Sequence, residues 1–412
     1  MLSSRCQQRN EAIIPSLLSQ HNAILMGDLA TIDLSTADNW RVKPKVLEEL
    51  RNMPGRLAES DLAYSSGIGG CSKTKGLLAD LFNIYFRPAR SVEPSHIVLA
   101  AGGSFALAAL IEQICDPGDG ILIASPYWAG LDISISIHGH ARIVPVHVPL
   151  NEFFSVKSVH YYESAIRASS LPIRAVLICN PHNPLGQCYP AGTILAMLEF
   201  CRQHDLHYIS DEVYALSAHR PYPAGFISFT SALELSNGRT SDRTHVIYSL
   251  SKDFGCNGMR LGALVSQSNK AVRLSAALSL HSQVSSLSTA LSSRLLSSDA
   301  TVRKITEYGS EQLYLAYIII RSFLETKEME FVPVASGMFV FARILKITTA
   351  EEEQELLKHV NAAGISISSG TSYHFQQPGW FRICYGVPQE QLQEGLRRLD
   401  VGIQNYLRLV SQ

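Results

Sequence analysis

The sequence predicts an α/β fold in which a mostly parallel central sheet is flanked by helices and is accompanied by a smaller α+β domain. Short, continuously apolar runs that end in Gly, Pro, Asn or Asp alternate with helical stretches through the middle of the chain. Such runs are typical of strands that are buried on both faces. From about residue 306 the pattern changes to long helices with fewer strands, which indicates a second structural unit.

Five apolar runs predict the strands of the central sheet. Between the first two runs, residues 105–115 carry Leu107, Leu110, Ile111 and Ile114 at helical spacing, so a βαβ unit is expected there. The five predicted strands are residues 96–101, 120–124, 174–179, 206–210 and 244–250.

The later part of the chain is expected to be mainly helical. Residues 275–298 are rich in Ser, Ala and Leu and contain no Pro or Gly, so we interpret them as a helix that leaves the large domain. A serine-rich linker is the alternative. The remaining predicted elements are helices at 308–326 and 389–407 and strands at 331–335, 338–342 and 381–385.

The length bounds the number of domains. With 412 residues, and about 150 residues per domain, two to three domains are expected. We place a large, cofactor-binding domain at 55–305 and a smaller one at 306–412, joined by the N-terminal segment 1–54.

Composition and charge exclude several classes of protein. The chain has 35 Lys and Arg against 36 Asp and Glu, a formal charge of −1, and 46% of its residues are hydrophobic. A nucleic-acid-binding protein would have a basic surplus, and a disordered chain would have few large apolar residues. The chain is therefore expected to be an enzyme that acts on a small molecule and has no nucleic-acid partner.

The cysteines and apolar runs indicate a cytoplasmic protein. The eight cysteines are scattered, with neither a CxxC pair nor zinc-ligand spacing, so no metal is expected. No apolar run approaches the roughly 20 residues that cross a bilayer, so no membrane partner is expected. Residues 1–10 lack the apolar stretch of a signal peptide.

Chemically useful side chains follow the predicted strands. Ligands of open α/β sheets lie at the carboxyl ends of strands, so these residues are expected to lie close together. Each has an ordinary structural alternative: Asp211 as a helix N-cap, Lys252 as a surface lysine, Trp128 as a core residue. The set consists of Gly102, Gly103, Ser104, Trp128, Asn183, Asp211, Tyr214, Lys252 and Arg260.

Together these residues supply what pyridoxal phosphate needs. A lysine amine forms the Schiff base, and a carboxylate keeps the pyridine nitrogen protonated, so that the ring accepts electrons. Cationic side chains and the backbone N–H groups of a helix start hold the phosphate. The conjunction favours a pyridoxal phosphate site over the separate structural alternatives.

Four strings carry a resemblance to a known family: Asn-Pro-His-Asn-Pro-Leu-Gly at 180–186, Ser-Asp-Glu-Val-Tyr at 210–214, Tyr-Ser-Leu-Ser-Lys-Asp at 248–253 and Pro-Gly-Trp-Phe-Arg-Ile at 378–383. From about Ile32 to Leu407 the chain resembles the class I/II aminotransferases of fold type I. Within them it is most similar to the branch that contains the 1-aminocyclopropane-1-carboxylate (ACC) synthases.

The resemblance implies a role for each residue. Lys252 would bind the cofactor aldehyde and move the proton at the substrate Cα, and Asp211 would pair with the pyridine nitrogen. Arg382 would bind the substrate α-carboxylate, although a surface arginine is the alternative. The remaining cofactor contacts implied are Tyr214 and Asn183 at the phenolic oxygen, Trp128 (or, as a second choice, Tyr127) stacked on the ring, and Ser249, Arg260 and the N–H groups of Ser104 and Phe105 at the phosphate.

Three further residues bear on assembly and reaction. Tyr64 resembles a tyrosine that family dimers lend to the neighbouring active site, which implies a homodimer; a loop tyrosine without a role is the alternative. Asp38 stands where ACC synthases carry a glutamate near the reacting side chain, and it is one methylene shorter. Phe105 stands where a small or hydroxylated residue usually helps to bind the phosphate.

Three hypotheses of function follow. The first, which we favour, is a pyridoxal phosphate enzyme of specialised metabolism that acts on an amino acid or amino-acid conjugate as an aminotransferase or carbon–sulfur lyase. ACC-synthase-like enzymes of fungal sulfur-containing toxin pathways are the precedent for the lyase. The second is an ACC synthase that uses S-adenosylmethionine. The third is a non-catalytic binding protein.

Overall fold

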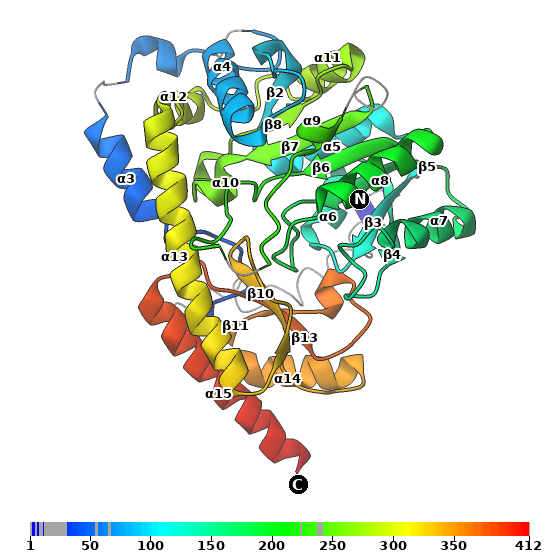
Figure 1. The fold of residues 1–412 in the computed structure, drawn as a ribbon, viewed down its shortest axis with the longest axis vertical. Helices are drawn as coiled ribbons and strands as arrows, with labels where there is room; N and C mark the ends of the chain where they lie inside the picture. The colour runs from blue at the N-terminus through cyan, green and yellow to red at the C-terminus, as the bar shows by residue number, and fades with distance from the viewer. Residues whose placement is uncertain are drawn as a thin grey trace.

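A computed structural model describes residues 2–4, 6–7, 11, 31–53, 57–64, 67–222, 225–236 and 242–411. The predicted domain boundary at residue 55 and most of residues 1–30 lie outside these ranges. Helices of the described ranges pack on both sides of a large sheet, and a smaller sheet lies below it in Figure 1.

The large sheet has seven strands in the order β2-β8-β7-β6-β5-β3-β4. Pairing is parallel from β7 to β4, and β8 runs antiparallel to both its neighbours, so the predicted mostly parallel sheet is confirmed. The strands are β2 (Ile97–Ala100), β3 (Gly120–Ser125), β4 (Arg142–His147), β5 (Ile173–Cys179), β6 (His207–Asp211), β7 (Thr244–Ser249) and β8 (Gly262–Val265).

Two of these strands were absent from the sequence prediction. The edge strand β4 is partly exposed and contains Pro145, so it lacks the continuous apolar run of an inner strand. The inner strand β8 is fully buried but only four residues long, which is too short to give a periodic signal. The five strands predicted for this sheet agree with β2, β3, β5, β6 and β7 to within two residues at each end.

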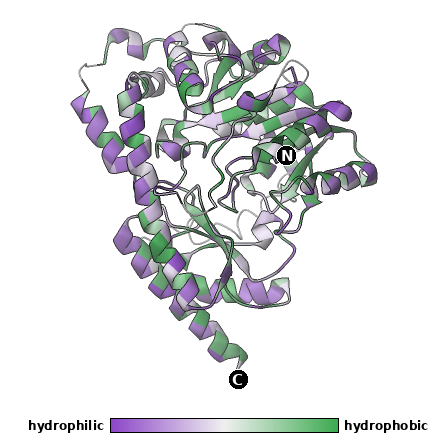
Figure 2. Cartoon of the chain, viewed as in Figure 1, coloured by the Kyte–Doolittle hydropathy of each residue, from purple (hydrophilic) through white to green (hydrophobic). Residues whose placement is uncertain are grey.

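Two apolar cores cover the faces of the large sheet. Alternate residues of each inner strand enter different cores: Ile97 and Leu99 of β2 face one, Val98 and Ala100 the other. This is why the inner strands are apolar at every position. Figure 2 shows apolar residues along these strands and mixed polarity along the helices. The helices that pack around the sheet include α4 (Ser72–Leu81), α5 (Gly103–Ile114), α7 (Ser158–Ala168), α8 (Ala191–Gln203) and α11 (Lys270–Ser279).

The prediction of one helix over 275–298 is wrong. The structure has α11, which ends at Ser279, and a separate helix α12 (Ser286–Leu295). Between them Ser282 adopts a left-handed backbone conformation with φ of 58°, which interrupts the helix. Serine, alanine and leucine tolerate helices, so composition alone did not mark this break.

The smaller region is built on an antiparallel sheet of order β12-β13-β10-β9. Its core includes Phe339, Phe381 and Leu399, and the N-terminal strand β1 (Ile32–Asp33) pairs with β11 (Ile365–Ser366). The other elements here are β9 (Glu330–Phe331), β10 (Phe339–Arg343), β12 (Ser368–Ser369), β13 (Trp380–Cys384), α14 (Ala350–Ala362) and α15 (Gln389–Val410).

Helix α13 (Asp299–Thr326) is 28 residues long and runs from the large sheet to the smaller one (Figure 1). It begins nine residues before the helix predicted at 308–326. Within the described ranges, no helix is both long and apolar enough to cross a membrane. The remaining helical elements are α3 (Lys43–Asn52), α6 (Gly130–Asp132), α9 (Ala232–Leu235), α10 (Leu250–Asp253), η1 (Glu59–Leu62), η2 (Phe82–Phe86), η3 (Pro94–His96), η4 (Ile133–His138), η5 (Asn257–Met259) and η6 (Thr371–Tyr373).

We expect the buried leucine of β8, Leu264, to contribute to the stability of the large sheet. Leu264 is fully buried in β8, so Leu264→Ala should lower the free energy of unfolding by about 2 to 5 kcal/mol, measured by urea denaturation. Leu278, on α11, is 76% exposed, and Leu278→Ala is the matched control with an expected change within about 0.5 kcal/mol. Equal losses in the two variants would contradict the assigned core.

Candidate active site

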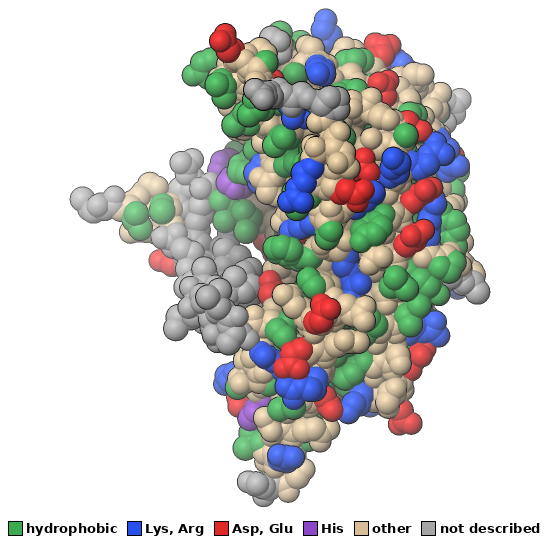
Figure 3. All heavy atoms as spheres, turned by 90° about the vertical axis from the view of Figure 1, so that its left-hand side faces the viewer, with side chains coloured by type: hydrophobic (Ala, Val, Ile, Leu, Met, Phe, Trp, Pro, Cys, Tyr) green, Lys and Arg blue, Asp and Glu red, His purple; other side chains and the backbone are tan. Residues whose placement is uncertain are grey.

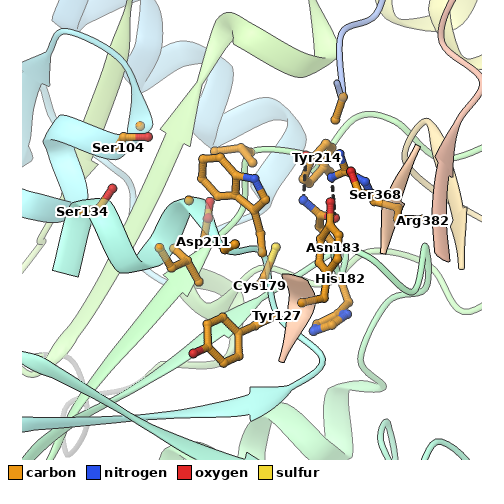
Figure 4. Close-up of a pocket in the computed structure, with 18 of the residues that line it drawn as sticks. Ser104, Tyr127, Ser134, Cys179, His182, Asn183, Asp211, Tyr214, Ser368 and Arg382 are labelled. Atoms are coloured by element: carbon orange, nitrogen blue, oxygen red, sulfur yellow. Dashed lines mark hydrogen bonds between the residues drawn. The ribbon is translucent and has the colours of Figure 1, made fainter. Parts of the chain in front are cut away.

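One cavity of about 430 Å³ lies at the carboxyl ends of the large sheet's parallel strands, and residues of the smaller region close its other side (Figure 4). Most of the predicted site residues line it, although they come from distant parts of the sequence. Those that line it are Ser104, Trp128, Asn183, Asp211, Tyr214, Ser249, Lys252, Arg260 and Arg382.

Lys252 lies on α10, directly after β7. Its Nζ donates a hydrogen bond to the carbonyl oxygen of Ala37 at 2.7 Å, and its side chain borders the cavity. Burial lowers the pKa of Lys252 to about 8, and the positive charge of Arg382 adds to this effect. The amine is thus neutral for a larger fraction of time than an exposed lysine, so the surface-lysine alternative is wrong.

Asp211 ends β6. Its Oδ1 is buried and has no hydrogen-bond partner among the described residues, and burial raises the pKa of this carboxyl to about 6 although a backbone hydrogen bond from Val213 opposes the shift. A turn rather than a helix follows β6, which excludes the N-cap alternative. A buried acceptor without a donor is costly, and a protonated ring nitrogen would remove that cost. This carboxylate therefore fits the pyridine nitrogen of pyridoxal phosphate.

Arg382, on β13, is only 3% exposed, so the surface-arginine alternative is wrong. Its Nη1 donates to Asn183 Oδ1 at 3.1 Å, and Nη2 donates to the carbonyl oxygen of Ser35. Asn183 Nδ2 in turn donates to Tyr214 Oη at 3.4 Å. Figure 4 shows these three side chains together at one side of the cavity. These hydrogen bonds hold the guanidinium in place, and its Nε has no partner in the described part of the chain, which suits it to bind a carboxylate.

An anion cradle lies at the start of α5. Gly102 has a φ of 97° and no side-chain cap closes the helix, so the first N–H groups of α5 are free for a ligand. A Cβ at Gly102 would lie 2.2 Å from Arg260 Nη2, which shows how closely this guanidinium packs on the turn. A Cβ on Gly262 would lie 2.3 Å from the carbonyl carbon of Gly102. Only glycine fits at these two positions.

Two serine hydroxyls complete the cradle. Ser249 Oγ lies 2.8 Å from Ser251 Oγ and 3.0 Å from the carbonyl oxygen of Leu261. Both serines line the cavity. Ser251 was not among the predicted site residues, although it lies between Ser249 and Lys252. The cradle fits a phosphate, because it combines N–H groups, hydroxyls and one guanidinium.

Two aromatic residues follow β3. Tyr127 is 3% exposed, and its ring stacks on His374 with centroids 4.3 Å apart. Trp128 is 38% exposed and lines the cavity, and a Cβ on Gly130 would lie 2.1 Å from its indole ring. Since the Tyr127 ring already has a stacking partner, Trp128 remains the better candidate for stacking on a cofactor ring.

Three predicted site residues do not line the cavity. Asp38 forms an ion pair with Lys43 at 2.8 Å. The Phe105 ring lies 5.3 Å from the ring of His138. Tyr64 is 93% exposed in the single chain.

Several cavity residues were not predicted from the sequence. Cys179 ends β5, so the rule of strand ends could have found it, whereas His182 lay unremarked within a quoted motif. Burial lowers the pKa of His182 to about 3, so its imidazole is neutral. Apart from Arg382, the cavity residues of the smaller region had no sequence signal, because only folding brings them to the cavity. They are Gln354, Leu357, Ile367, Ser368, Ser369, Ser372 and Tyr373.

The fold matches that of solved aminotransferases. A single mutant of the Thermus thermophilus aspartate aminotransferase superimposes with a TM-score of 0.80 at 21% identity, covering 97% of this chain and 99% of that one. An aromatic aminotransferase from Pyrococcus horikoshii OT3 superimposes with a TM-score of 0.74 at 18% identity, covering 94% and 99%. The expected fold type I architecture is confirmed.

Sequence comparisons define the family. A family model described as "Aminotransferase class I and II" matches residues 28–399. "Probable aminotransferase tcpI" of Claviceps purpurea is 47% identical over 98% of this chain and 97% of its own length, and "Probable aminotransferase sirI" of Leptosphaeria maculans is 44% identical over 97% of each. "1-aminocyclopropane-1-carboxylate synthase 1" of Oryza sativa is 32% identical over 93% of this chain and 81% of its own length.

The chain belongs to the aminotransferase class I and II family. It is an enzyme that depends on pyridoxal 5′-phosphate and acts on a small amino-acid substrate, as the resemblance predicts. The non-catalytic alternative is therefore set aside.

The lowered pKa of Lys252 has a measurable consequence. Apoenzyme should capture pyridoxal phosphate at a rate that rises with pH, with a midpoint near 8, because only the neutral amine is nucleophilic. Stopped-flow absorbance measures this rate. Removing the nearby positive charge in Arg382→Leu should raise the midpoint. A midpoint near 10.4, which is about the value of an exposed lysine, would contradict the assigned environment.

Proposed function

We propose that this enzyme is an aminotransferase or carbon–sulfur lyase that acts on an L-amino acid or amino-acid conjugate. The observation that carries the proposal is that Lys252, Asp211 and Arg382 line one cavity of about 430 Å³. The amine of Lys252 can bind the cofactor aldehyde, the carboxylate of Asp211 can bind the pyridine nitrogen, and the guanidinium of Arg382 can bind the substrate α-carboxylate. The lowered pKa of Lys252 and the unpaired oxygen of Asp211 support the same assignment.

Each side chain has a proposed task. Pyridoxal phosphate, when bound, supplies the reactive aldehyde and the electron-accepting ring. Asp211 binds the ring nitrogen, Trp128 covers the ring, and Asn183 and Tyr214 contact the phenolic oxygen. Arg260, Ser249 and the first N–H groups of α5 bind the phosphate.

Proton transfer at the substrate falls to Lys252. A base is most effective when its pKa lies near the working pH, and burial brings Lys252 toward that range. Arg382 holds the α-carboxylate and thereby places the Cα hydrogen beside the amine. The geometry around the substrate side chain then decides between transamination and elimination.

Ring closure on S-adenosylmethionine is the weaker alternative. Asp38, which stands where ACC synthases carry a glutamate, pairs with Lys43 and does not line the cavity. The relatives named as probable aminotransferases are 47% and 44% identical, whereas the rice ACC synthase is 32% identical. We therefore favour transamination or elimination, in the specialised metabolism of a fungus.

We further propose a homodimer in which Tyr64 reaches the neighbouring active site. In the single chain Tyr64 is 93% exposed, and Leu62 and Ile68 beside it are 73% and 70% exposed. Figure 3 looks onto the side of the molecule that carries α3 and α13, where hydrophobic side chains lie at the surface. A second copy of the chain would cover such residues. A large cofactor domain at 55–305 and a cytoplasmic location stay predictions.

The first test of the proposed function is the visible absorbance of the enzyme with bound pyridoxal phosphate. Purified enzyme should absorb in the visible after addition of pyridoxal phosphate, and Lys252→Ala should lose this band, because no other amine is positioned at the cavity in the described part of the chain. Lys157→Ala, on a lysine outside the cavity lining, is the control. If the wild-type enzyme shows no visible absorbance band after addition of pyridoxal phosphate, the proposed function is wrong.

Product analysis with the same purified enzyme distinguishes transamination, elimination and ring closure. Keto acid that forms only with an acceptor indicates transamination, and pyruvate with ammonia from a cysteine S-conjugate indicates elimination. ACC formed from S-adenosylmethionine would overturn the preference stated above.

Arg382 should control substrate affinity. Loss of two charge-assisted hydrogen bonds in Arg382→Leu should raise KM by about 100-fold for any substrate with an α-carboxylate. Arg303→Leu, on the exposed face of α13, is the control and should leave KM unchanged. An unchanged KM in Arg382→Leu would show that another group binds the carboxylate.

A further inference from the structure

The anion cradle has a large apolar residue, Phe105, at the third position of α5. Phe105 follows Ser104 on α5 and has no hydroxyl to offer to a phosphate. Its ring is 38% exposed and lies 5.3 Å from the His138 ring, outside the cavity lining. The side chain of Phe105 therefore contributes a contact between α5 and η4 instead of a contact to a ligand.

The contact with His138 is part of the packing of η4 against α5. Ser134 lies four residues before His138 on the same helix, so both side chains are on the side that packs against α5. Ser134 is 1% exposed and lines the cavity. Figure 4 places Ser134 next to Ser104, at the end of the cavity opposite Arg382.

Ser134 lines the cavity, and its backbone oxygen accepts from the N–H of Gly139 at 3.0 Å. A hydroxyl at a cavity wall can donate one hydrogen bond to an acceptor on a ligand. The donors at this end of the cavity are the first N–H groups of α5 and the guanidinium of Arg260, whereas Ser249 Oγ donates to the carbonyl oxygen of Leu261. Their common partner is an anion.

We propose that Ser134 donates a hydrogen bond to the phosphate of the cofactor and replaces the hydroxyl that Phe105 lacks. The inference rests on the proposed role of the cavity as the pyridoxal phosphate site. Ser134 is thus a phosphate-binding residue supplied by η4, a segment outside the glycine turn. It acts on the phosphate ester alone and has no part in holding the aldehyde or the ring.

Comparing pyridoxal phosphate with pyridoxal isolates this contact, since the two ligands differ only in the phosphate. Apo Ser134→Ala should bind pyridoxal phosphate at least about tenfold more weakly than the wild type, as expected for one hydrogen bond to a charged group. Its affinity for pyridoxal should not change. Titrations followed by quenching of protein fluorescence give both dissociation constants without a measurement of activity.

Three variants keep the result interpretable. Ser134→Thr retains the hydroxyl and should bind the cofactor like the wild type, and Ser134→Cys tests the same loss at nearly constant volume if the alanine variant does not fold. Ser158→Ala is the control, because Ser158 is 2% exposed and lies outside the cavity lining, and its Oγ has no hydrogen-bond partner among the residues that the structure describes.

The outcomes separate this inference from the proposed function. An unchanged affinity for pyridoxal phosphate in folded Ser134→Ala or Ser134→Cys, or an equal loss for both ligands, would overturn the role of Ser134 and leave the cofactor site standing. Failure of the wild-type enzyme to bind pyridoxal phosphate would overturn both.

Discussion

The parallel pairing of β5, β6 and β7 is the constraint on which the site depends. Cys179 pairs with Asp211 and Asp211 with Ile247, so the three strands end at nearly the same level. Beyond the strand ends the backbone bonds continue: Asn180 N donates to Asp211 O, and Glu212 N donates to Ile247 O, both at 2.9 Å. A shift of register in any of these strands would separate the asparagine turn, the carboxylate and the lysine.

Burial shifts the pKa values of Lys252 and Asp211, and the same loss of hydration lowers the stability of the folded chain. The same desolvation lowers the pKa of Lys252 to about 8 and raises that of Asp211 to about 6, so burial makes the charged form of each group less stable than it is in water. A bound cofactor supplies the missing opposite charges and hydrogen bonds. Holoenzyme formation and folding stability are therefore linked, because a ligand that binds only the folded chain stabilises it.

Much of this arrangement could be predicted from the sequence, because strand ends in an α/β sheet converge. Asp211 and Lys252 follow apolar runs directly, and the sheet brings them together. By contrast, Ser134 and Tyr373 reach the cavity through the packing of η4 and η6, and no periodicity in their segments points to a ligand. Asp38 was predicted to be a site residue, but its carboxylate pairs with Lys43 and does not line the cavity. The sequence pattern did not indicate this ion pair.

The long helix α13 has a mechanical consequence. At 28 residues, and a rise of about 1.5 Å per residue, it forms a rod of roughly 42 Å. Near its first half Gly309 packs on Val42, and its last turns, which include Leu324, belong to the core of the smaller sheet. The last turns of α13 share a core with Phe381, which lies on β13 beside Arg382. A tilt of α13 relative to the large sheet would therefore move this core, and β13 with it.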